Sequence, residues 1–380
     1  VQTCALPICS FSKLLLFFKE KGVFSAIWQV GGPIFFGSKI AWKILAIFAF
    51  TQLIFMRFIP GKTIQGPITP KGNIPHYKAN GVTAFLLTLS LFYLSTHIFH
   101  FFPATIIYDN FGDLLGALNL FSLLFCLFLY FKGKIRPSST DCGSSGNFIF
   151  DYFWGTELYP KIGGWDVKMF TNCRFGMMSW GLILLSFAAK QQELYGSMTN
   201  GMILSVGLQL LYIAKFFYWE PGYMRSMDIM HDRAGYAICW GCLVWVPGIY
   251  TSPTLFLVNH PLVLSETLYS LLLLGGLLSI GANYLADAQR QKVRASQGNC
   301  LIWKKKPSLI KAYYQTVQGE TKKSILLASG FWKISRHFHY LPELTATLCW
   351  SLPALFTSPL PYFYLLFLTA LLLDRLSRHE

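Results

Sequence analysis

The chain alternates between long apolar runs and shorter polar loops, the pattern of a protein that crosses a membrane several times. A helix needs about 20 apolar residues to cross about 30 Å of hydrocarbon. The runs that approach or reach this length are residues 42–58, 81–102, 114–131, 176–189, 201–214, 235–249, 265–285, 344–356 and 362–373, with 10–18 as a candidate for part of another. The pattern predicts an all-α polytopic membrane protein with about nine to ten transmembrane helices and no Rossmann domain.

The composition supports a membrane protein. Only 13% of the 380 residues are charged and 53% are hydrophobic, whereas about 25% of the residues of soluble domains are charged. The net charge of +15 would by itself suggest a nucleic-acid-binding protein. The basic residues, however, lie in short loops between apolar runs, as the positive-inside rule describes. We therefore expect membrane lipids around the chain and no nucleic-acid partner.

The Lys and Arg counts of successive loops alternate between high and low. Six lie in 132–175 and one in 190–200, then three in 215–234, none in 250–264 and eleven in 286–343. A missed or misplaced span would break this alternation, so the basic loops are predicted to be cytoplasmic. The host decides the membrane: the endoplasmic reticulum in a eukaryote, the inner membrane in a bacterium.

The first eight residues, VQTCALPI, resemble the translation of a sequencing adapter, and we expect residues 1–8 to be an artefact. We divide the remaining chain into an N-terminal helical half, 9–200, and a C-terminal helical half, 201–380.

Two short motifs resemble functional sites but lie inside apolar runs. Cys239 and Cys242 form a C-x-x-C without a surrounding soluble fold, and we interpret them as small packing residues. Gly275 and Gly276, with Gly281, resemble part of a dinucleotide loop, but no strand precedes them. Close helix packing is the better interpretation, and a nicotinamide cofactor would have to bind without a Rossmann domain.

Polar residues at the edges of apolar runs form the first two candidate sites. Asp151 and Glu157 flank a Gly/Pro turn, where they either orient a substrate or lock the loop through Lys161 or Arg174; we favour the second. Charged groups at such positions are costly unless they are used or paired.

The second candidate site contains Asp228, His231 and Asp232, with Glu220 before them. It is a weak candidate for a metal site, because one D-x-x-H spacing does not define a ligand set, and we predict no metal. Tyr250 lies near the end of the following apolar run. It is either a proton donor or an ordinary tyrosine of the membrane interface.

The third candidate site is the basic stretch 286–343. Asp287, Arg290 and Arg294 recur at steps of three and four and so share one helix face. The two arginines are suited to clamp a phosphate group. Trp332 and Tyr340 offer flat rings on which a nicotinamide or adenine could stack.

These regions resemble the sterol reductase family, which includes delta-14 and delta-7 sterol reductases and the lamin B receptor, over about residues 28–380. The segments that carry the resemblance are 77–81 (YKANG), 105–110 (TIIYDN), 155–163 (GTELYPKIG), 185–191 (LSFAAKQ), 300–303 (CLIW), 329–338 (SGFWKISRHF) and 361–364 (PYFY). The delta-7 branch is the most similar. The resemblance implies that NADPH enters from the cytoplasm and a sterol from the bilayer, with both pockets in the half 201–380.

The same resemblance implies residue roles. The cofactor-binding positions would be Arg290, Arg294, Leu327, Trp332, Tyr340 and Arg375, and the proton relay would be Tyr250. We add His339 to the cofactor-binding positions and His379 to the catalytic ones, since His379 or Glu380 would tune Tyr250. Proton transfer followed by hydride transfer from NADPH would reduce a ring double bond, because an alkene accepts hydride poorly before it is protonated.

The chain departs from the family at several of these positions. The family has Asn where this chain has His339, Gly-Asp where it has Pro342-Glu343, and Arg-Asp where it has Arg378-His379. The family's basic C-terminal segment is missing, and we expect the C-terminus to be truncated. The alternatives to delta-7 reduction are a delta-14 or delta-24 reductase, a non-catalytic sterol-binding protein and a membrane methyltransferase that uses S-adenosylmethionine.

Overall fold

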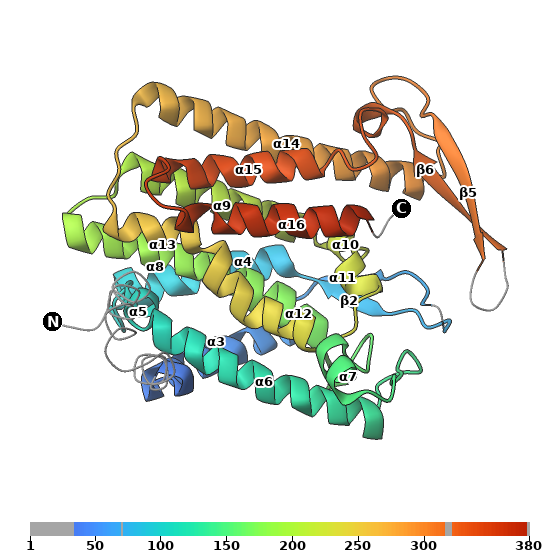
Figure 1. Cartoon of the computed structure of the whole chain (residues 1–380), viewed down its shortest axis with the longest axis horizontal. Helices are drawn as coiled ribbons and strands as arrows, with labels where there is room; N and C mark the ends of the chain where they lie inside the picture. The colour runs from blue at the N-terminus through green and yellow to red at the C-terminus, as the bar shows by residue number, and fades with distance from the viewer. Residues whose placement is uncertain (1–33, 70, 316–320, 378–380) are drawn as a thin grey trace, which may run out of the picture. The chain divides into compact units, whose positions relative to one another are not determined.

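A computed structural model describes residues 34–69, 71–315 and 321–377, and its principal elements are helices (Figure 1). The α-helices are α3 (Lys39–Phe58), α4 (Gly81–Tyr93), α5 (Ile106–Asp109), α6 (Phe111–Ile135), α7 (Phe148–Trp154), α8 (Met177–Tyr195), α9 (Asn200–Tyr218), α10 (Glu220–Tyr223), α11 (Met227–Met230), α12 (Tyr236–Trp240), α13 (Ser252–Asn259), α14 (Glu266–Ala295), α15 (Tyr340–Ser351) and α16 (Phe363–Ser377). Wider helical turns form η1 (Leu94–Ile98), η2 (Met169–Gly176) and η3 (Gly241–Tyr250), and 3-10 turns form η4 (Gly330–Lys333), η5 (Leu352–Ala354) and η6 (Leu360–Tyr362).

Each predicted apolar run between residues 42 and 373 lies largely on these helices, which confirms the helical membrane fold. In the described part of the chain, seven helical stretches are long and apolar enough to cross a membrane: Ile34–Phe58, Gly81–Ile98, Phe111–Ile135, Asn200–Tyr218, Tyr236–Asn259, Glu266–Ala295 and Leu360–Ser377. The larger number of about nine to ten stays a prediction. The run 10–18 and the segment 1–8 lie outside the described residues.

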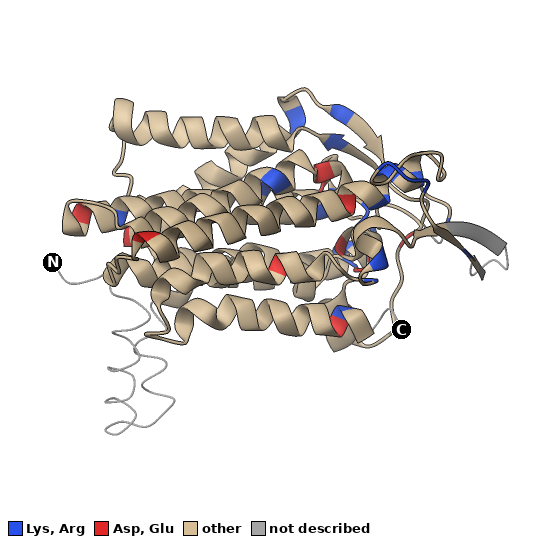
Figure 2. Ribbon diagram, turned by 90° about the horizontal axis from the view of Figure 1, so that it is seen from above, with Lys and Arg blue, Asp and Glu red and all other residues tan. Residues whose placement is uncertain are grey.

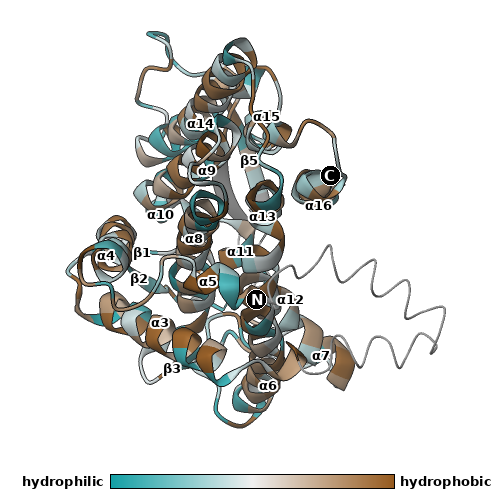
Figure 3. Cartoon of the chain, turned by 90° about the vertical axis from the view of Figure 1, so that its left-hand side faces the viewer, coloured by the Kyte–Doolittle hydropathy of each residue, from teal (hydrophilic) through white to brown (hydrophobic). Residues whose placement is uncertain are grey.

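Colouring by charge and by hydropathy shows why these helices suit a bilayer. The long helices are mostly free of charged residues, which gather toward helix ends and in the loops (Figure 2). Hydrophobic colour covers much of α3, α6 and α14 (Figure 3). The chain is an integral membrane protein.

The strands form three antiparallel hairpins in the loops. β1 (Lys62–Gln65) pairs with β2 (His76–Ala79), β3 (Lys161–Ile162) with β4 (Trp165–Asp166), and β5 (Leu309–Gln315) with β6 (Thr321–Leu327). Within the described ranges no parallel sheet is present. The hairpins therefore extend the loops between helices and do not form a domain of their own.

The chain divides into two compact units. Unit 1 comprises Val1–Gly196 and Met224–Thr251, and unit 2 comprises Ser197–Tyr223 and Ser252–Glu380. In unit 1, the side chains of Leu118, Phe175 and Leu243 form part of the buried core. Cys239 packs in a second buried cluster with Cys126, as the packing interpretation of the C-x-x-C motif predicts.

In unit 2, the paired glycines allow helices to approach closely. A Cβ atom added at Gly276 of α14 would lie 2.6 Å from Leu208 Cδ1 on α9, and one added at Gly275 would lie 3.3 Å from Cys349 Sγ on α15. A side chain at either position would have to displace Leu208 or Cys349, as expected for close packing of membrane helices. Gly281 faces open space, so the same explanation does not extend to it.

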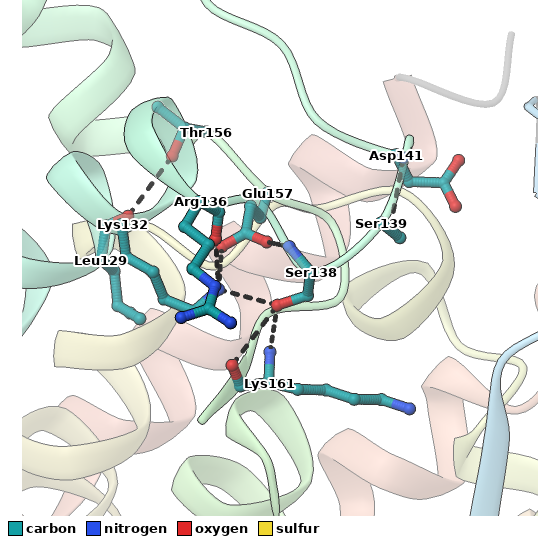
Figure 4. A network of polar contacts seen from close by, with 9 residues as sticks. All are labelled: Leu129, Lys132, Arg136, Ser138, Ser139, Asp141, Thr156, Glu157 and Lys161. Atoms are coloured by element: carbon teal, nitrogen blue, oxygen red, sulfur yellow. Dashed lines mark hydrogen bonds and ion pairs between the residues drawn. The ribbon is translucent and has the colours of Figure 1, made fainter. Parts of the chain in front are cut away.

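Asp151 and Glu157 lock the loop after α6, but not through the partners that the sequence suggested; Figure 4 shows the contacts of Glu157. Glu157 Oε2 accepts a hydrogen bond from Lys132 Nζ at 2.7 Å, and its other oxygen accepts one from the Ser138 amide. Lys134 Nζ lies 4.0 Å from Asp151, which also accepts hydrogen bonds from Ser144 and Ser145. The expected partners Lys161 and Arg174 were wrong, because α6 places its basic last turn against this loop.

Replacing Glu157 by Gln should destabilise unit 1 by about 3 kcal/mol, since it leaves the largely buried Lys132 without its carboxylate. The Lys132 and Glu157 side chains are only 14% and 4% exposed. Glu193→Gln is the matched control, because Glu193 also pairs with a lysine but is 53% exposed; it should cost less than about 0.5 kcal/mol. Thermal unfolding in detergent would measure both, and equal shifts would contradict the locking role.

Candidate functional site

The candidate site is built on the basic end of α14 in unit 2. The helix has 30 residues, and at 1.5 Å per residue it is about 45 Å long. A hydrocarbon layer of about 30 Å leaves several turns outside it. Apart from Glu266 in the first turn, the charged residues of α14 lie at the end with Asp287, Arg290 and Arg294, so this end is the part suited to contact water-soluble molecules.

Arg290 is held in place by two neighbours. Its Nη2 atom donates a hydrogen bond to Asp287 Oδ1 at 2.9 Å, one helical turn earlier. The guanidinium carbon lies 4.8 Å from the centre of the Trp332 ring. A cation above an indole face is attracted by its electron density, and the planar guanidinium also stacks on it. The structure thus brings Arg290 and Trp332, two of the predicted cofactor-binding residues, into direct contact.

Trp332 continues into a cluster of aromatic rings. Its Nε1 atom donates a hydrogen bond to the Ala286 carbonyl at 2.8 Å, which fixes the indole against α14. The Trp332 and His339 ring centres are 5.1 Å apart, and those of His339 and Tyr340 are 4.5 Å apart. His337 stacks on Tyr340 at 5.0 Å. Four of the predicted cofactor residues, Arg290, Trp332, His339 and Tyr340, thus share one cluster.

Gly330 sets the turn that brings Trp332 to α14. It has φ +65°, and a Cβ atom there would lie 2.2 Å from Gln289 Oε1. That same Oε1 atom accepts a hydrogen bond from the Phe331 amide at 3.2 Å. Any larger residue would strain the backbone and displace this contact, so the Ser-Gly-Phe-Trp motif has a geometric reason.

A polar network that sequence reasoning missed holds α15 against its neighbours. Asn283 Nδ2 of α14 donates to the His339 carbonyl at 3.0 Å and to Glu343 Oε2 at 2.9 Å. Lys215 Nζ of α9 donates to Asn283 Oδ1, and the Tyr212 hydroxyl donates to Glu343 Oε1. The available signal was the presence of Asn283 and Glu343 within otherwise apolar helices, where a polar group needs a partner.

The remaining predicted residues lie elsewhere. Leu327 ends β6, Arg294 is exposed in the last turn of α14, and Arg375 is half-buried in the last turn of α16. Tyr250 is the last residue of η3 in unit 1, where its ring packs edge-on against buried Trp180 at 5.3 Å. His379 lies outside the described residues. The roles of these residues stay predictions.

The acidic segment 228–232 of unit 1 is held from inside by a lysine. Lys168 is buried, and its Nζ atom donates to the carbonyl oxygens of Ile229 and Asp232 at 2.8 and 2.7 Å. Burial lowers the pKa of Lys168 to about 8, against the opposing charges of Asp166 and Asp228. The described part of the chain has no group of three or more side chains suited to hold a metal ion.

The pKa of Lys168 predicts how stability changes with pH. The folded chain loses this proton near pH 8 and the unfolded chain near 10.5, so in between the unfolded chain binds more protons and stability rises with pH. The gain relative to Lys168→Met should reach about 3 kcal/mol by pH 10.5. Denaturation of both proteins at several pH values tests this, and a difference that does not change with pH would contradict it.

Comparison with known proteins shows the family of this chain. The model of the Ergosterol biosynthesis ERG4/ERG24 family matches residues 10–380. The chain belongs to this family. Among similar members is 7-dehydrocholesterol reductase of Arabidopsis thaliana, which is 50% identical over 342 residues, covering 90% of this chain and 79% of that protein. The predicted resemblance to sterol reductases is confirmed.

Two further relatives are less similar to this chain. The 7-dehydrocholesterol reductase of Xenopus laevis is 40% identical over 348 residues, covering 90% of this chain and 74% of that protein. The Delta(14)-sterol reductase of Methylotuvimicrobium alcaliphilum is 40% identical over 329 residues, covering 84% and 72%. The cluster around Arg290 therefore lies within the region that the chain shares with its family.

Proposed function

We propose that this ERG4/ERG24 protein reduces the 7,8 double bond of a 7-dehydrocholesterol-like sterol with NADPH. The 50% identity to the Arabidopsis thaliana 7-dehydrocholesterol reductase carries the proposal. The apolar helices give a sterol access from the lipid, and the basic end of α14 gives a soluble cofactor access from water. The enzyme would work in the endoplasmic reticulum of a eukaryotic host, or in the inner membrane of a bacterial one.

The cluster formed by Arg290, Trp332, His339 and Tyr340 fits a phosphorylated dinucleotide. Arg290 is held by Asp287 and Trp332 before any ligand binds, so little side-chain freedom would be lost on binding. His339 and Tyr340 present further rings, and Arg294 adds a guanidinium four residues along the same helix face. NADPH supplies a hydride when bound. The chain's own residues would grip its phosphates and orient its rings.

A proton must reach the sterol from the protein, and we assign this to Tyr250. A phenol that is packed against an apolar ring is held in one position, as an acid that protonates a carbon centre requires. His379 or Glu380 would adjust the acidity of Tyr250. The side chains around the Tyr250 ring would exclude water from the carbocation that forms when the sterol is protonated.

The second candidate function is reduction of the 14,15 double bond, favoured by the 40% identity to a Delta(14)-sterol reductase. Incubating purified protein and NADPH with 7-dehydrocholesterol, and separately with an 8,14-diene sterol, distinguishes the two. We expect the first to lose its 7,8 double bond, as gas chromatography with mass spectrometry would show. Turnover of the 8,14-diene alone would favour the second candidate. Sterol binding without NADPH oxidation would indicate a non-catalytic protein.

A further inference from the structure

Unit 1 contains a basic pocket that the proposed reaction does not use. We call it the hairpin pocket, because its walls come from the end of α3 and from the hairpins β1–β2 and β3–β4. It has a volume of about 340 Å³, and Arg57, Lys78, Lys161, Trp165, Asp166 and Arg174 are among its lining residues. Its lining residues are Met56 and Arg57 at the end of α3 and residues of two loops, 59–80, which contains three lysines, and the basic loop 132–175.

The charge of the hairpin pocket is strongly positive. Four cationic side chains, those of Arg57, Lys78, Lys161 and Arg174, face one carboxylate, that of Asp166. Burial raises the pKa of Asp166, which weakens even this negative charge. Asp166 also has a structural role: its Oδ1 atom accepts a hydrogen bond from the Met169 amide at 2.9 Å and so caps η2. An anion would be attracted and a cation repelled.

The floor of the pocket is rigid and its rim is open. On the floor, Arg174 is buried and donates to Asn80 Oδ1 at 2.7 Å. On the rim, Arg57 and Lys161 are exposed, and within the described residues neither side chain has a hydrogen bond or ion pair. Lys161 is attached to the fold through its backbone, whose amide donates to Ser138 Oγ at 2.8 Å (Figure 4).

The pocket lies where a predicted membrane span ends. Lys78 Nζ donates to the Arg57 carbonyl at 2.7 Å, and Trp165 Nε1 donates to the Leu53 carbonyl at 3.2 Å, so both hairpins are joined to the last turns of α3. The candidate span Ile34–Phe58 ends at the same turns. Tryptophan and basic residues at such an end are typical of the headgroup level of a bilayer. Basic pockets between membrane helices are suited to anionic headgroups.

We propose that the hairpin pocket binds a phosphate group, presented either by an anionic phospholipid or by a small phosphorylated solute. Two guanidinium groups match the paired oxygens of a phosphate, and lysine ammonium groups neutralise its remaining charge. The volume accommodates a phosphate with a glycerol-sized substituent, and the open rim leaves room for acyl chains to reach the lipid. The site is independent of the proposed reductase reaction.

The test uses the full chain in phosphatidylcholine nanodiscs without sterol or cofactor. Isothermal titration calorimetry would compare dioctanoyl phosphatidic acid, glycerol 3-phosphate and inorganic phosphate. We expect at least one of them to bind, and Arg57→Gln and Lys161→Gln to weaken that binding about tenfold or more, since each removes a charge-assisted hydrogen bond. Lys161→Arg should retain it. Both replaced side chains are exposed, so thermal unfolding should be unchanged.

Lys62→Gln is the matched control, because it removes one charge from an exposed position on β1 that does not line the pocket. Much tighter binding of dioctanoyl phosphatidic acid than of glycerol 3-phosphate would identify a lipid as the source of the phosphate. Similar affinities would identify a soluble phosphate ester. The proposal is overturned if none of the three binds, or if Lys62→Gln weakens binding as much as the rim variants. Neither result depends on sterol reduction, so failure of this proposal would leave the proposed reductase function untouched, and the reverse also holds.

Discussion

Replacing Tyr250 by Phe is expected to lower kcat for sterol reduction by about 10²–10⁴-fold, the usual contribution of a positioned general acid. The substitution removes only the hydroxyl group and keeps the ring that packs against Trp180. The KM values for sterol and NADPH should change little, because the proton is transferred only in the transition state. Steady-state kinetics with 7-dehydrocholesterol, together with thermal unfolding in detergent, would measure the effect.

Tyr195→Phe is the control for this experiment. Tyr195 ends α8 in the same unit and is 46% exposed, so the loss of its hydroxyl should leave kcat unchanged. If Tyr250→Phe retains more than about one tenth of the activity, another group supplies the proton. If it instead raises the KM for sterol at constant kcat, Tyr250 contributes to substrate binding and not to proton transfer.

The helices were predictable wherever they face lipid, because lipid contact requires unbroken apolar sequence. The prediction failed at the start of the helical stretch that ends in α8. The run was expected at 176–189, but helical structure begins with η2 at Met169 and continues to Tyr195. The missed part contains Thr171 and Arg174, which are buried against protein. A hydropathy pattern cannot register a helix whose polar side chains are satisfied inside the fold.

The candidate site was predictable where its residues are close in sequence. The helical spacing of Asp287 and Arg290 requires only a helix, and the resemblance supplied Trp332 and Tyr340. The contacts of Glu343 were not predictable, because its partner Tyr212 is 131 residues away in the chain and on another helix. Only the fold shows that this residue anchors α15, on which Tyr340 lies. Glu343 anchors α15 at one of the positions where this chain differs from the family, which has Asp there.

A second large effect is expected at the exposed end of α14. Arg294→Gln should raise the KM for NADPH about 10- to 100-fold, since one charge-assisted hydrogen bond contributes roughly 1.5–3 kcal/mol. NADH lacks the 2′-phosphate, so its KM should change by no more than about threefold. Equal changes for NADPH and NADH would reject recognition of the 2′-phosphate by Arg294.

The neighbouring basic residue separates specific recognition from general attraction. Lys292 is exposed in the same last turn of α14, and its Nζ atom approaches the Leu301 carbonyl at 3.5 Å. Lys292→Gln removes the same unit of charge, but Lys292 does not lie on the face shared by Asp287, Arg290 and Arg294. If Arg294 grips the phosphate, only Arg294→Gln should change the ratio of the two KM values. If the basic end acts only by its summed charge, both variants should weaken NADPH binding equally, and the effect should vanish at high salt, which screens exposed charges.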